Sequence, residues 1–400
     1  MEQSFWQKLQ RVKPKDIAHI FLFLLAWPIA FVYRRFRKDL WLVCDNENEA
    51  RDNGYWFFKY VAENHKTQDI MYAINKKSPD YERVKSIGTV VSYGSFLHWV
   101  YYLTASKNIS SQKEGKPNAA VCYVLEVYGI LKNTRVFLQH GITKDDMEFL
   151  YYRHTKMRLF VCAVEKEYQY IKERFGYPKG WVQKLGFCRF DNLIDTSEGR
   201  RQILVMPTWR NWISTPTTKS YRYENIDEFT ETAYYKNWRA FLRDERLYRL
   251  LEKEDITLVF YPHRQMQKYL HYFELEHPNI VLAKWPEYDV QELLKESNLL
   301  ITDYSSIAMD FAYMRKPLLY YQFDYEMFRK GHYAEGYFSY QDDGFGKVCK
   351  ETDILLEEIK KCVANEFEIE EMYRNRADEF YLGMDKNSCE HNYRAVKELC

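Results

Sequence analysis

The stretch NLLITDYSSIAMDFAYMRKPLLYYQFD, from Asn298 to Asp324, decides the fold. Its apolar run Leu299–Thr302 predicts a short buried strand, which leads into a polar turn. Residues 306–315 then predict a helix, and a second apolar strand follows at Leu318–Tyr321. Strand, helix and strand in this order are typical of a parallel sheet with helices packed on its faces. The segment therefore indicates an α/β protein.

The same alternation extends along most of the chain. We predict strands at Leu40–Cys44, Ile70–Ile74, Val90–Tyr93, Arg135–Gln139, Leu159–Ala163, Trp181–Leu185, Ile203–Met206, Thr257–Tyr261, Ile280–Ala283, Leu299–Thr302 and Leu318–Tyr321. Helices are predicted between them, for example at Tyr55–Asn64 and Glu165–Phe175. A polar break at Thr196–Arg201 separates the first six strands from the rest.

We therefore predict two doubly wound Rossmann-type domains that face a cleft, at residues 40–195 and 196–385. A chain of 400 residues fits two domains of ordinary size. Residues 386–400 are predicted to form a C-terminal helix. In such folds ligands bind at the C-terminal ends of the strands, so polar residues at those ends are candidates for a site.

The overall composition excludes some classes of protein. With 46% hydrophobic and 29% charged residues the chain is typical of a packed globular protein. Its formal net charge is +1, which gives no global field to attract nucleic acid. The eight cysteines are scattered without a C-x-x-C pair, and Cys44 and Cys162 lie in apolar runs. This pattern favours reduced cytosolic thiols over a zinc site or a disulfide framework.

Residues 1–39 form a basic, apolar segment that we predict to contact a membrane. The run Ile17–Tyr33 contains only one strongly polar side chain, His19. As a helix it would reach about 26 Å, short of the ~30 Å hydrocarbon core, and Pro28 interrupts its hydrogen bonding. Eight Lys and Arg residues lie on its two flanks against three acidic ones. Cations on both flanks favour an interfacial or re-entrant helix on an anionic leaflet over a crossing. A helix buried beneath the first domain is the alternative.

The turn after Leu299–Thr302 carries the sharpest chemical signal. Ser305 lies where a helix N-cap is expected, and two hydroxyl groups with free backbone N–H groups favour an anion such as phosphate. Asp310 comes one turn later on the same face as Ser306 and would accept hydrogen bonds from a polyol. Capping alone would explain the same residues, because Ser and Asp are common at helix starts.

A second signal is RVFLQHGITKDD, from Arg135 to Asp146. A predicted strand again runs into a turn, with His140 at its end and Gly141 permitting an unusual backbone angle. A histidine at this place can act as a general base or donate to a phosphate. A purely structural histidine is the alternative.

Further polar residues follow other predicted strands. LVMPTWR and FYPHRQM bring Thr208, Trp209, Arg210, His263 and Arg264 to strand ends of the second domain, and LGFCRFDNL adds Arg189 near the hinge. Arginine binds phosphate through two hydrogen bonds, and an aromatic ring can flank a base or ribose. Each residue alone could simply be solvated, but together they indicate a binding site.

Several common motifs are absent from the sequence. There is no G-x-x-x-x-G-K-[ST], no G-x-G-x-x-G after a strand, no G-x-S-x-G and no H-E-x-x-H. A D-x-D metal motif is also missing, so we predict no bound metal or cofactor and leave a need for Mg²⁺ open.

At these motifs the sequence resembles the CDP-glycerol glycerophosphotransferase family of teichoic-acid and capsule enzymes. The resemblance rests on ITDYSS with the following helix and KPLLYYQFD, on ARDNG at Ala50–Gly54, on the His-Gly turn at His140, and on GFCRFD and PTWR. It extends over about residues 40–385. After the His-Gly pair this chain reads ITKDD, where many polymerases of the family read TPLK.

The resemblance implies a two-domain GT-B fold, association with the cytoplasmic membrane face, and release of CMP. It implies an N-terminal acceptor domain and a C-terminal CDP-donor domain. His140 matches the family's base, and His263 is the second predicted catalytic residue. The predicted donor- and phosphate-binding residues are Gly141, Ile142, Thr143, Arg189, Thr208, Trp209, Arg210, Arg264, Asp303, Ser305, Ser306 and Asp310.

The predicted reaction is transfer of glycerol phosphate or ribitol phosphate from a CDP-linked donor to a lipid-linked, undecaprenyl-type glycan acceptor. Two alternatives remain. A GT-B glycosyltransferase using a nucleotide sugar would have the same fold and a similar site. A non-catalytic membrane-bound protein of transferase descent would need none of the residues at the strand ends.

Overall fold

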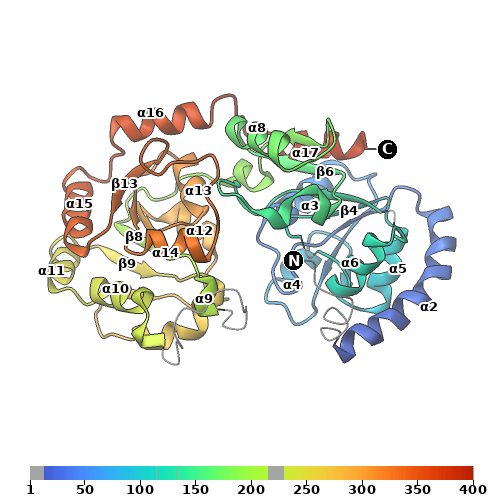
Figure 1. The fold of residues 1–400 in the computed structure, drawn as a ribbon, viewed down its shortest axis with the longest axis horizontal. Helices are drawn as coiled ribbons and strands as arrows, with labels where there is room; N and C mark the ends of the chain where they lie inside the picture. Colours follow the sequence, from blue (N-terminus) through green and yellow to red (C-terminus); the bar gives the residue numbers. More distant parts are fainter. Residues whose placement is uncertain (1–12, 114, 132, 215–228, 400) are drawn as a thin grey trace. The chain divides into compact units, whose positions relative to one another are not determined.

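The computed structural model describes residues 13–113, 115–131, 133–214 and 229–399, which divide into two units. Unit 1 comprises Met1–His140, Phe149–Asn192 and Asp385–Cys400, and unit 2 comprises Gly141–Glu148 and Leu193–Met384. Each unit has a parallel sheet with helices on its faces (Figure 1), so the predicted α/β class is confirmed. The sequence did not predict that Gly141–Glu148 packs with unit 2.

Within the described residues, unit 1 has a seven-stranded parallel sheet in the order β3-β2-β1-β4-β5-β6-β7. The strands are β1 Trp41–Val43, β2 Ile70–Ile74, β3 Val90–Ser92, β4 Lys107–Ser110, β5 Thr134–Phe137, β6 Leu159–Cys162 and β7 Val182–Lys184. The helices are α2 Pro14–Phe36, α3 Asn53–Asn64, α4 Tyr81–Lys85, α5 Phe96–Thr104, α6 Ala119–Val127, α7 Tyr152–Thr155, α8 Glu165–Arg174 and α17 Ser388–Lys397.

Unit 2 has, in its described part, a six-stranded parallel sheet in the order β10-β9-β8-β11-β12-β13. The strands are β8 Gln202–Met206, β9 Thr257–Phe260, β10 Ile280–Leu282, β11 Leu299–Thr302, β12 Leu318–Tyr321 and β13 Gly346–Cys349. The helices are α9 Asn211–Ser214, α10 Ala233–Leu242, α11 Glu245–Lys253, α12 Val290–Glu296, α13 Ile307–Tyr313, α14 Tyr325–Gly331, α15 Thr352–Ala364 and α16 Glu371–Phe380.

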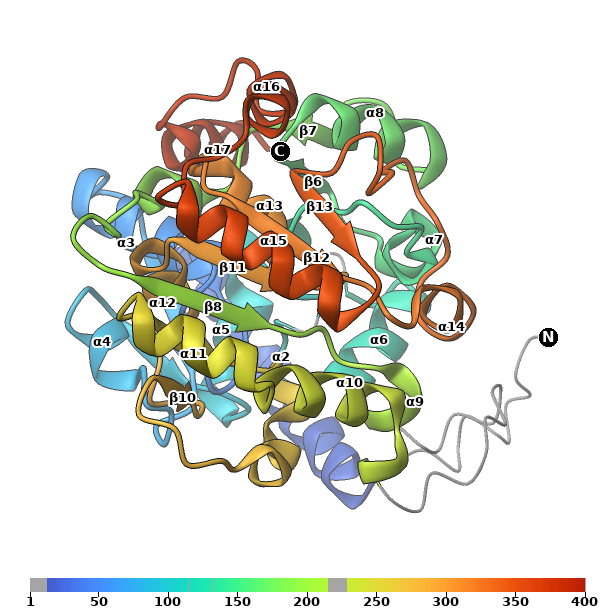
Figure 2. The same cartoon turned by 90° about the vertical axis from the view of Figure 1, so that its left-hand side faces the viewer.

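The core of unit 2 lies between its sheet and a layer of three helices. Figure 2 shows α10, α11 and α15 together on one face of the sheet. Trp238 of α10, Leu251 of α11 and Ile359 of α15 are fully buried there against Val205 and Leu258. The alternating apolar residues that predicted the strands are thus the residues that fill this core.

All eleven predicted strands are present, with ends shifted by at most two residues. The prediction missed β4 and β13. The sequence of β4, KNIS, looks like a loop because Lys107 and Asn108 are polar, yet both are buried in the centre of the sheet. Asn108 donates to the carbonyl of Tyr102 at 3.2 Å, and Lys107 pairs with Asp39 at 3.3 Å. Partners outside the strand therefore compensate for polar residues that argue against a strand.

In each sheet the strand order reverses at one place, and loops diverge there. In unit 1 the reversal lies between β1 and β4, and in unit 2 it lies between β8 and β11. Ligands in doubly wound sheets bind at such a reversal, beyond the C-terminal ends of the strands. The loops after β8 and β11 contain Thr208–Arg210 and Asp303–Ser306, so the fold places these predicted site residues where binding is expected.

The N-terminal helix α2 is longer than the predicted run Ile17–Tyr33. It begins at Pro14, continues through Pro28 and ends at Phe36. Its 23 residues reach about 34 Å, and by length and composition it could cross a membrane. The estimate of 26 Å was wrong because the helix continues into the flanking charged residues.

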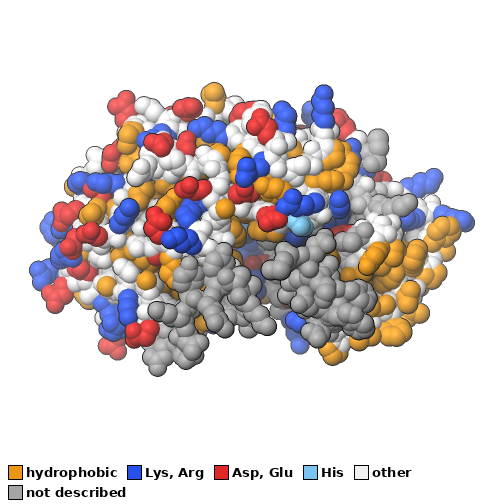
Figure 3. Space-filling model, in the orientation of Figure 1, with side chains coloured by type: hydrophobic (Ala, Val, Ile, Leu, Met, Phe, Trp, Pro, Cys, Tyr) orange, Lys and Arg blue, Asp and Glu red, His pale blue; other side chains and the backbone are white. Residues whose placement is uncertain are grey.

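One face of α2 packs on unit 1 and the other is exposed. Phe23, Ala26 and Ala30 are buried against α5 and α6, and Nε1 of Trp99 donates to Nδ1 of His19 at 3.0 Å. The exposed face carries large apolar side chains, which Figure 3 shows gathered over α2. The predicted burial beneath the first domain is thus present along one side of the helix, and membrane contact of the other side stays a prediction.

Candidate active site

His140 lies three residues beyond β5, and its side chain is 66% exposed. Its Nδ1 atom is 2.5 Å from Oδ2 of Asp52. Since an ionised carboxylate only accepts hydrogen bonds, Nδ1 carries the proton and donates it to Asp52. The lone pair of the neutral ring then resides on Nε2, which is the atom able to take a proton from a substrate.

Asp52 is held in place by the start of α3 and by two neighbouring side chains. It is the N-cap of α3, and its Oδ1 accepts from the backbone N–H of Asn53 at 2.8 Å. The guanidinium of Arg189 donates to the same Oδ1 at 3.1 Å and to the carbonyl of His140 at 2.9 Å. Nε2 of Gln112, from the loop after β4, donates to Oδ2 at 3.3 Å. These bonds fix the carboxylate that orients His140.

This arrangement revises the predicted role of Arg189. We predicted donor binding, but the side chain is only 6% exposed, and its hydrogen bonds to Asp52 and to the carbonyl of His140 hold the loop of His140. Arg189 is therefore a positioning residue inside unit 1.

Asn53 fixes the turn that carries His140. Its Nδ2 atom donates to the carbonyls of Leu138 and Gln139 at 3.3 and 2.6 Å, and its Oδ1 accepts from the N–H of Arg189 at 3.0 Å. Gln139 has a φ of 64°, a left-handed conformation that is uncommon for residues other than glycine. The unusual backbone angle predicted for Gly141 therefore lies two residues earlier.

A second carboxyl group, Asp45, lies buried beneath the start of α3. It accepts hydrogen bonds from the N–H groups of Tyr55 and Ser111 and from the hydroxyl of Tyr72, each at 3.0 Å. Burial, together with the negative charge of Asp52, raises the pKa of Asp45 to about 6. Burial also opposes ionisation of Asp52, but its interaction with His140 and the charge of Arg189 outweigh this effect and lower the pKa of Asp52. Asp52, the carboxyl group beside His140, is thus the one that keeps its negative charge.

Gly141 is required for close packing. A Cβ atom on Gly141 would lie 2.6 Å from Oγ of Ser306 and 3.2 Å from its Cβ, so Ser306 would have to shift to admit a side chain here. The turn after His140 and the turn before α13 therefore touch through a glycine.

The segment Gly141–Glu148 is anchored in unit 2 by a buried ion cluster. Asp145 pairs with Lys144 at 2.5 Å and with Arg329 of α14 at 2.6 Å, and all three are largely buried. Ile142 and Thr143, which were predicted to bind the donor, are 1% and 2% exposed. Their side chains are packing residues, so the predicted side-chain contact with a ligand is not supported.

Arg210 and Asp303 form a second buried cluster. Arg210 is fully buried and pairs with Asp303 at 2.9 Å and with Asp324 at 2.8 Å. Burial opposes its charge, but the two carboxylates prevail and raise the pKa of Arg210. Asp303 is also fully buried and accepts from the N–H of Thr208 at 2.8 Å. We predicted that Arg210 and Asp303 bind phosphate, but in this structure their side chains join the loops after β8, β11 and β12.

Above this cluster the loop after β8 presents an aromatic group. The ring of Trp209 lies 4.4 Å from that of His332 and 6.1 Å from that of His263. Nδ1 of His332 accepts from the N–H of Asn211 at 3.3 Å, and burial and the charge of Arg210 lower the pKa of His332 to about 3. His332 is therefore a neutral wall beside Trp209.

His263 has a defined proton position. Its Nδ1 atom accepts a hydrogen bond from the N–H of Gln265 at 3.3 Å, so the proton of the neutral ring lies on Nε2. This tautomer donates a hydrogen bond and suits a phosphate oxygen better than it suits proton abstraction. The guanidinium of the neighbouring Arg264 lies 4.2 Å from the ring centroid of Trp285.

The serine turn differs from the prediction in detail. Ser306 rather than Ser305 precedes α13, and the Ser305 hydroxyl accepts from the N–H of Ile307 at 3.3 Å. Asp310 lies on α13 and is 5% exposed. In the described part of the chain no cluster of three or more His, Cys, Asp or Glu side chains is arranged to hold a metal ion.

Known proteins share the sequence pattern that carries these residues. The sequence pattern of the CDP-Glycerol:Poly(glycerophosphate) glycerophosphotransferase family matches residues 28–398. The chain belongs to this family. The resemblance predicted from ITDYSS and the His-Gly turn is therefore confirmed.

Relatives within the family include much longer proteins. The chain is 34% identical over 388 residues to the minor teichoic acid biosynthesis protein GgaB of Bacillus subtilis (strain 168), with 94% of this chain and 42% of that protein covered. It is 20% identical to the teichoic acid poly(glycerol phosphate) polymerase of Staphylococcus epidermidis, with 82% and 46% covered. The chain thus spans less than half the length of these relatives.

Solved structures agree on the fold. A structure of the wall teichoic acid polymerase TagF superposes with a TM-score of 0.67 at 15% identity, with 98% of this chain and 97% of that one covered. A UDP-N-acetylglucosamine 2-epimerase from Listeria monocytogenes gives a TM-score of 0.56 at 12% identity, with 90% and 95% covered. At these identities the likeness shows the fold alone, and it confirms the GT-B-like architecture.

The sequence analysis of this family member missed several residues of the site. Asp52 lies in the ARDNG motif, which was noted without assigning a role to its carboxylate. An N-cap aspartate is ordinary, and nothing local indicates that it reaches a histidine 88 positions away. Asn53 lies in the same motif and was also given no role. Gln112 and His332 gave no signal, because each acts through contacts between loops that are distant in sequence.

Proposed function

We propose that the chain transfers glycerol phosphate or ribitol phosphate from a CDP-linked donor to a lipid-linked teichoic-acid or capsular glycan, and releases CMP. Family membership supports the class of reaction. The names of relatives support both polyols, since they include poly(glycerol phosphate) polymerases and the ribitol-phosphate polymerase TarK of Staphylococcus aureus. The observation that carries the proposal is the Asp52–His140 hydrogen bond.

In the proposed reaction His140 is the general base. Its Nε2 atom takes the proton of an acceptor hydroxyl while that oxygen attacks the distal phosphorus of the donor. A new P–O bond forms, the bond between this phosphorus and the bridging oxygen breaks, and CMP leaves with the bonding pair. Asp52 stabilises the imidazolium that results. A general base of this kind contributes roughly 10²–10⁴-fold to the rate.

The donor is assigned to the loops of unit 2. Nε2–H of His263 and the hydroxyls of Ser305 and Ser306 are suited to phosphate oxygens, and Trp209 offers a flat surface for the base or ribose. Arg264 adds a positive charge, Thr208 lies at the same strand end, and Asp310 is retained as the partner of a polyol hydroxyl. Positioning and electrostatics would supply most of the catalysis, as in phosphoryl transfer generally.

We place the reaction at the cytoplasmic face of the membrane, with α2 lying in the interface. The exposed apolar face of α2 and the cations at its two ends support this placement. Packing of Phe23, Ala26 and Ala30 on unit 1 favours a helix lying along the protein over an isolated crossing.

The test is to identify the nucleotide that is released. The purified protein would be incubated with CDP-glycerol, CDP-ribitol or UDP-sugars and with glycan acceptors on short, water-soluble prenyl chains. CMP release with one CDP-polyol, lost in His140→Ala, is the expected result. Release of UDP from a nucleotide sugar would replace the proposal with a glycosyltransferase, and no turnover with any pair would contradict both.

A further inference from the structure

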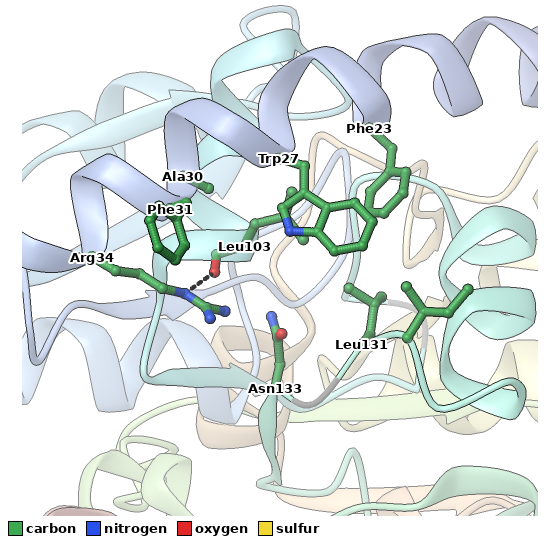
Figure 4. A pocket seen from close by; sticks show the side chains of 9 residues that line it. Phe23, Trp27, Ala30, Phe31, Arg34, Leu103, Leu131 and Asn133 are labelled. Atoms are coloured by element: carbon green, nitrogen blue, oxygen red, sulfur yellow. Dashed lines mark hydrogen bonds between the residues drawn. The ribbon is translucent and has the colours of Figure 1, made fainter.

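A pocket of about 170 Å³ lies in unit 1 between α2 and the connection from α6 to β5. Phe23, Trp27 and Phe31 of α2 form one wall, and Leu131 lies on the other (Figure 4). Trp27 and Phe31 are 49% and 61% exposed, so the pocket opens onto the apolar surface of α2. Its lining is therefore continuous with the face that we assign to the membrane interface.

One side of this pocket is polar. Arg34 and Asn133 line it, and Nε of Arg34 donates to the carbonyl of Leu103 at 2.7 Å. This bond holds the guanidinium at the pocket. Among the described residues no hydrogen bond or ion pair engages the two terminal nitrogens of Arg34. An apolar slot with an open guanidinium at its side matches an acyl chain that ends in a phosphate.

The surroundings of the pocket have the character of a lipid contact. Ile130, beside it, is 46% exposed, and Tyr128 just before it is 69% exposed. Arg35 and Lys38 lie exposed near Arg34 at the end of α2. Apolar and aromatic side chains next to a cluster of cations are typical of the headgroup region of an anionic leaflet.

We propose that this pocket binds one anionic phospholipid, with its phosphate on Arg34 and the upper part of one acyl chain between Phe23, Trp27 and Leu131. The proposal rests on the proposed interfacial placement of α2 and adds a specific site to it. The lipid anchors unit 1 at a fixed depth and is not a substrate.

The position of the pocket in the sheet argues against the acceptor lipid as its occupant. Asn133 directly precedes β5, whereas His140 lies beyond the other end of this strand. The four residues of β5 span about 13 Å, so the pocket lies at the N-terminal end of this strand and the base candidate lies beyond its C-terminal end. A prenyl chain bound in this pocket would therefore lie at the end of β5 that is away from His140.

The experiment is calorimetric titration of the 400-residue chain with dihexanoylphosphatidylglycerol, below the concentration at which this lipid forms micelles. We expect one saturable site. Arg34→Gln should weaken binding at least about tenfold, because hydrogen bonds to a charged group contribute ~1.5–3 kcal/mol. Leu131→Trp, which fills the pocket without changing charge, should also weaken it. Arg35→Gln is the matched control and should bind as the unaltered protein does.

Three results would overturn the proposal. Equal losses in Arg34→Gln and Arg35→Gln would mean attraction by surface charge only. Equal binding of inorganic phosphate would mean an anion site without a lipid, and tighter binding of citronellyl phosphate would assign the pocket to a prenyl lipid. Unfolding midpoints of all variants control for misfolding. Because the titration needs no turnover, its failure would leave the proposed transferase activity untouched.

Discussion

At the scale of single residues, the site depends on which polar groups are exposed and which are consumed by the fold. His140 is exposed and oriented by Asp52, whereas Arg210 is buried between Asp303 and Asp324. Both were candidates on the same grounds, as polar residues at strand ends. Their environments assign one to chemistry and the other to the architecture of unit 2.

Replacing Asp52 by Asn should remove the base without removing the histidine. An amide would donate to Nδ1 and force the proton onto Nε2, so we expect turnover to fall by about 10²–10⁴-fold with little change in donor KM. Steady-state CMP release measures both quantities. Asp69→Asn, in the partly exposed pair with Arg37, is the control and should retain full activity. A raised KM at normal turnover would reassign Asp52 to donor binding.

Replacing Arg210 by Ala should destabilise unit 2, because it leaves two buried carboxylates without their cation. Breaking a buried ion pair from one side costs about 3–5 kcal/mol. Arg249→Ala is the matched control: Arg249 is 75% exposed in a pair with Glu245, and its loss should cost under about 1 kcal/mol. Denaturant unfolding compares them. If Arg210→Ala kept its stability and only bound the donor more weakly, the architectural role would be wrong.

At the scale of elements, the contact between the two turns can be tested by its sterics. Gly141→Ala should cost about 1–3 kcal/mol in unfolding free energy, since its Cβ would meet Ser306 at 2.6 Å. Ser306→Gly removes the clashing atoms. Gly141→Ala introduced into the Ser306→Gly variant should therefore cost little, and the double variant should be nearly as stable as Ser306→Gly alone. Gly129→Ala is not a suitable control, because its φ of 67° adds backbone strain. Additive losses in the double variant would show that the two turns do not touch.

At the scale of the whole molecule, α2 should bind membranes through one face only. Phe21→Glu with Leu25→Glu alters side chains that are 62% and 63% exposed. We expect this variant to lose flotation with phosphatidylglycerol vesicles at an unchanged unfolding midpoint. Ala26→Glu places a charge at a fully buried position against unit 1 and should unfold the protein instead. Undiminished flotation of the double variant would place the membrane contact elsewhere.

The sequence by itself determined the α/β class, all but two strands, the family, and the strand ends that carry the site. These depend on local patterns, because alternating apolar runs and turn residues follow from the short-range geometry of helices and strands. Only the tertiary structure decided that Asp52 orients His140, that Gly141 packs on Ser306, and that Arg210 is unavailable to a ligand. These facts depend on contacts between loops 88 to 165 positions apart, and on burial, which turns a polar residue that could bind a ligand into one that is already paired.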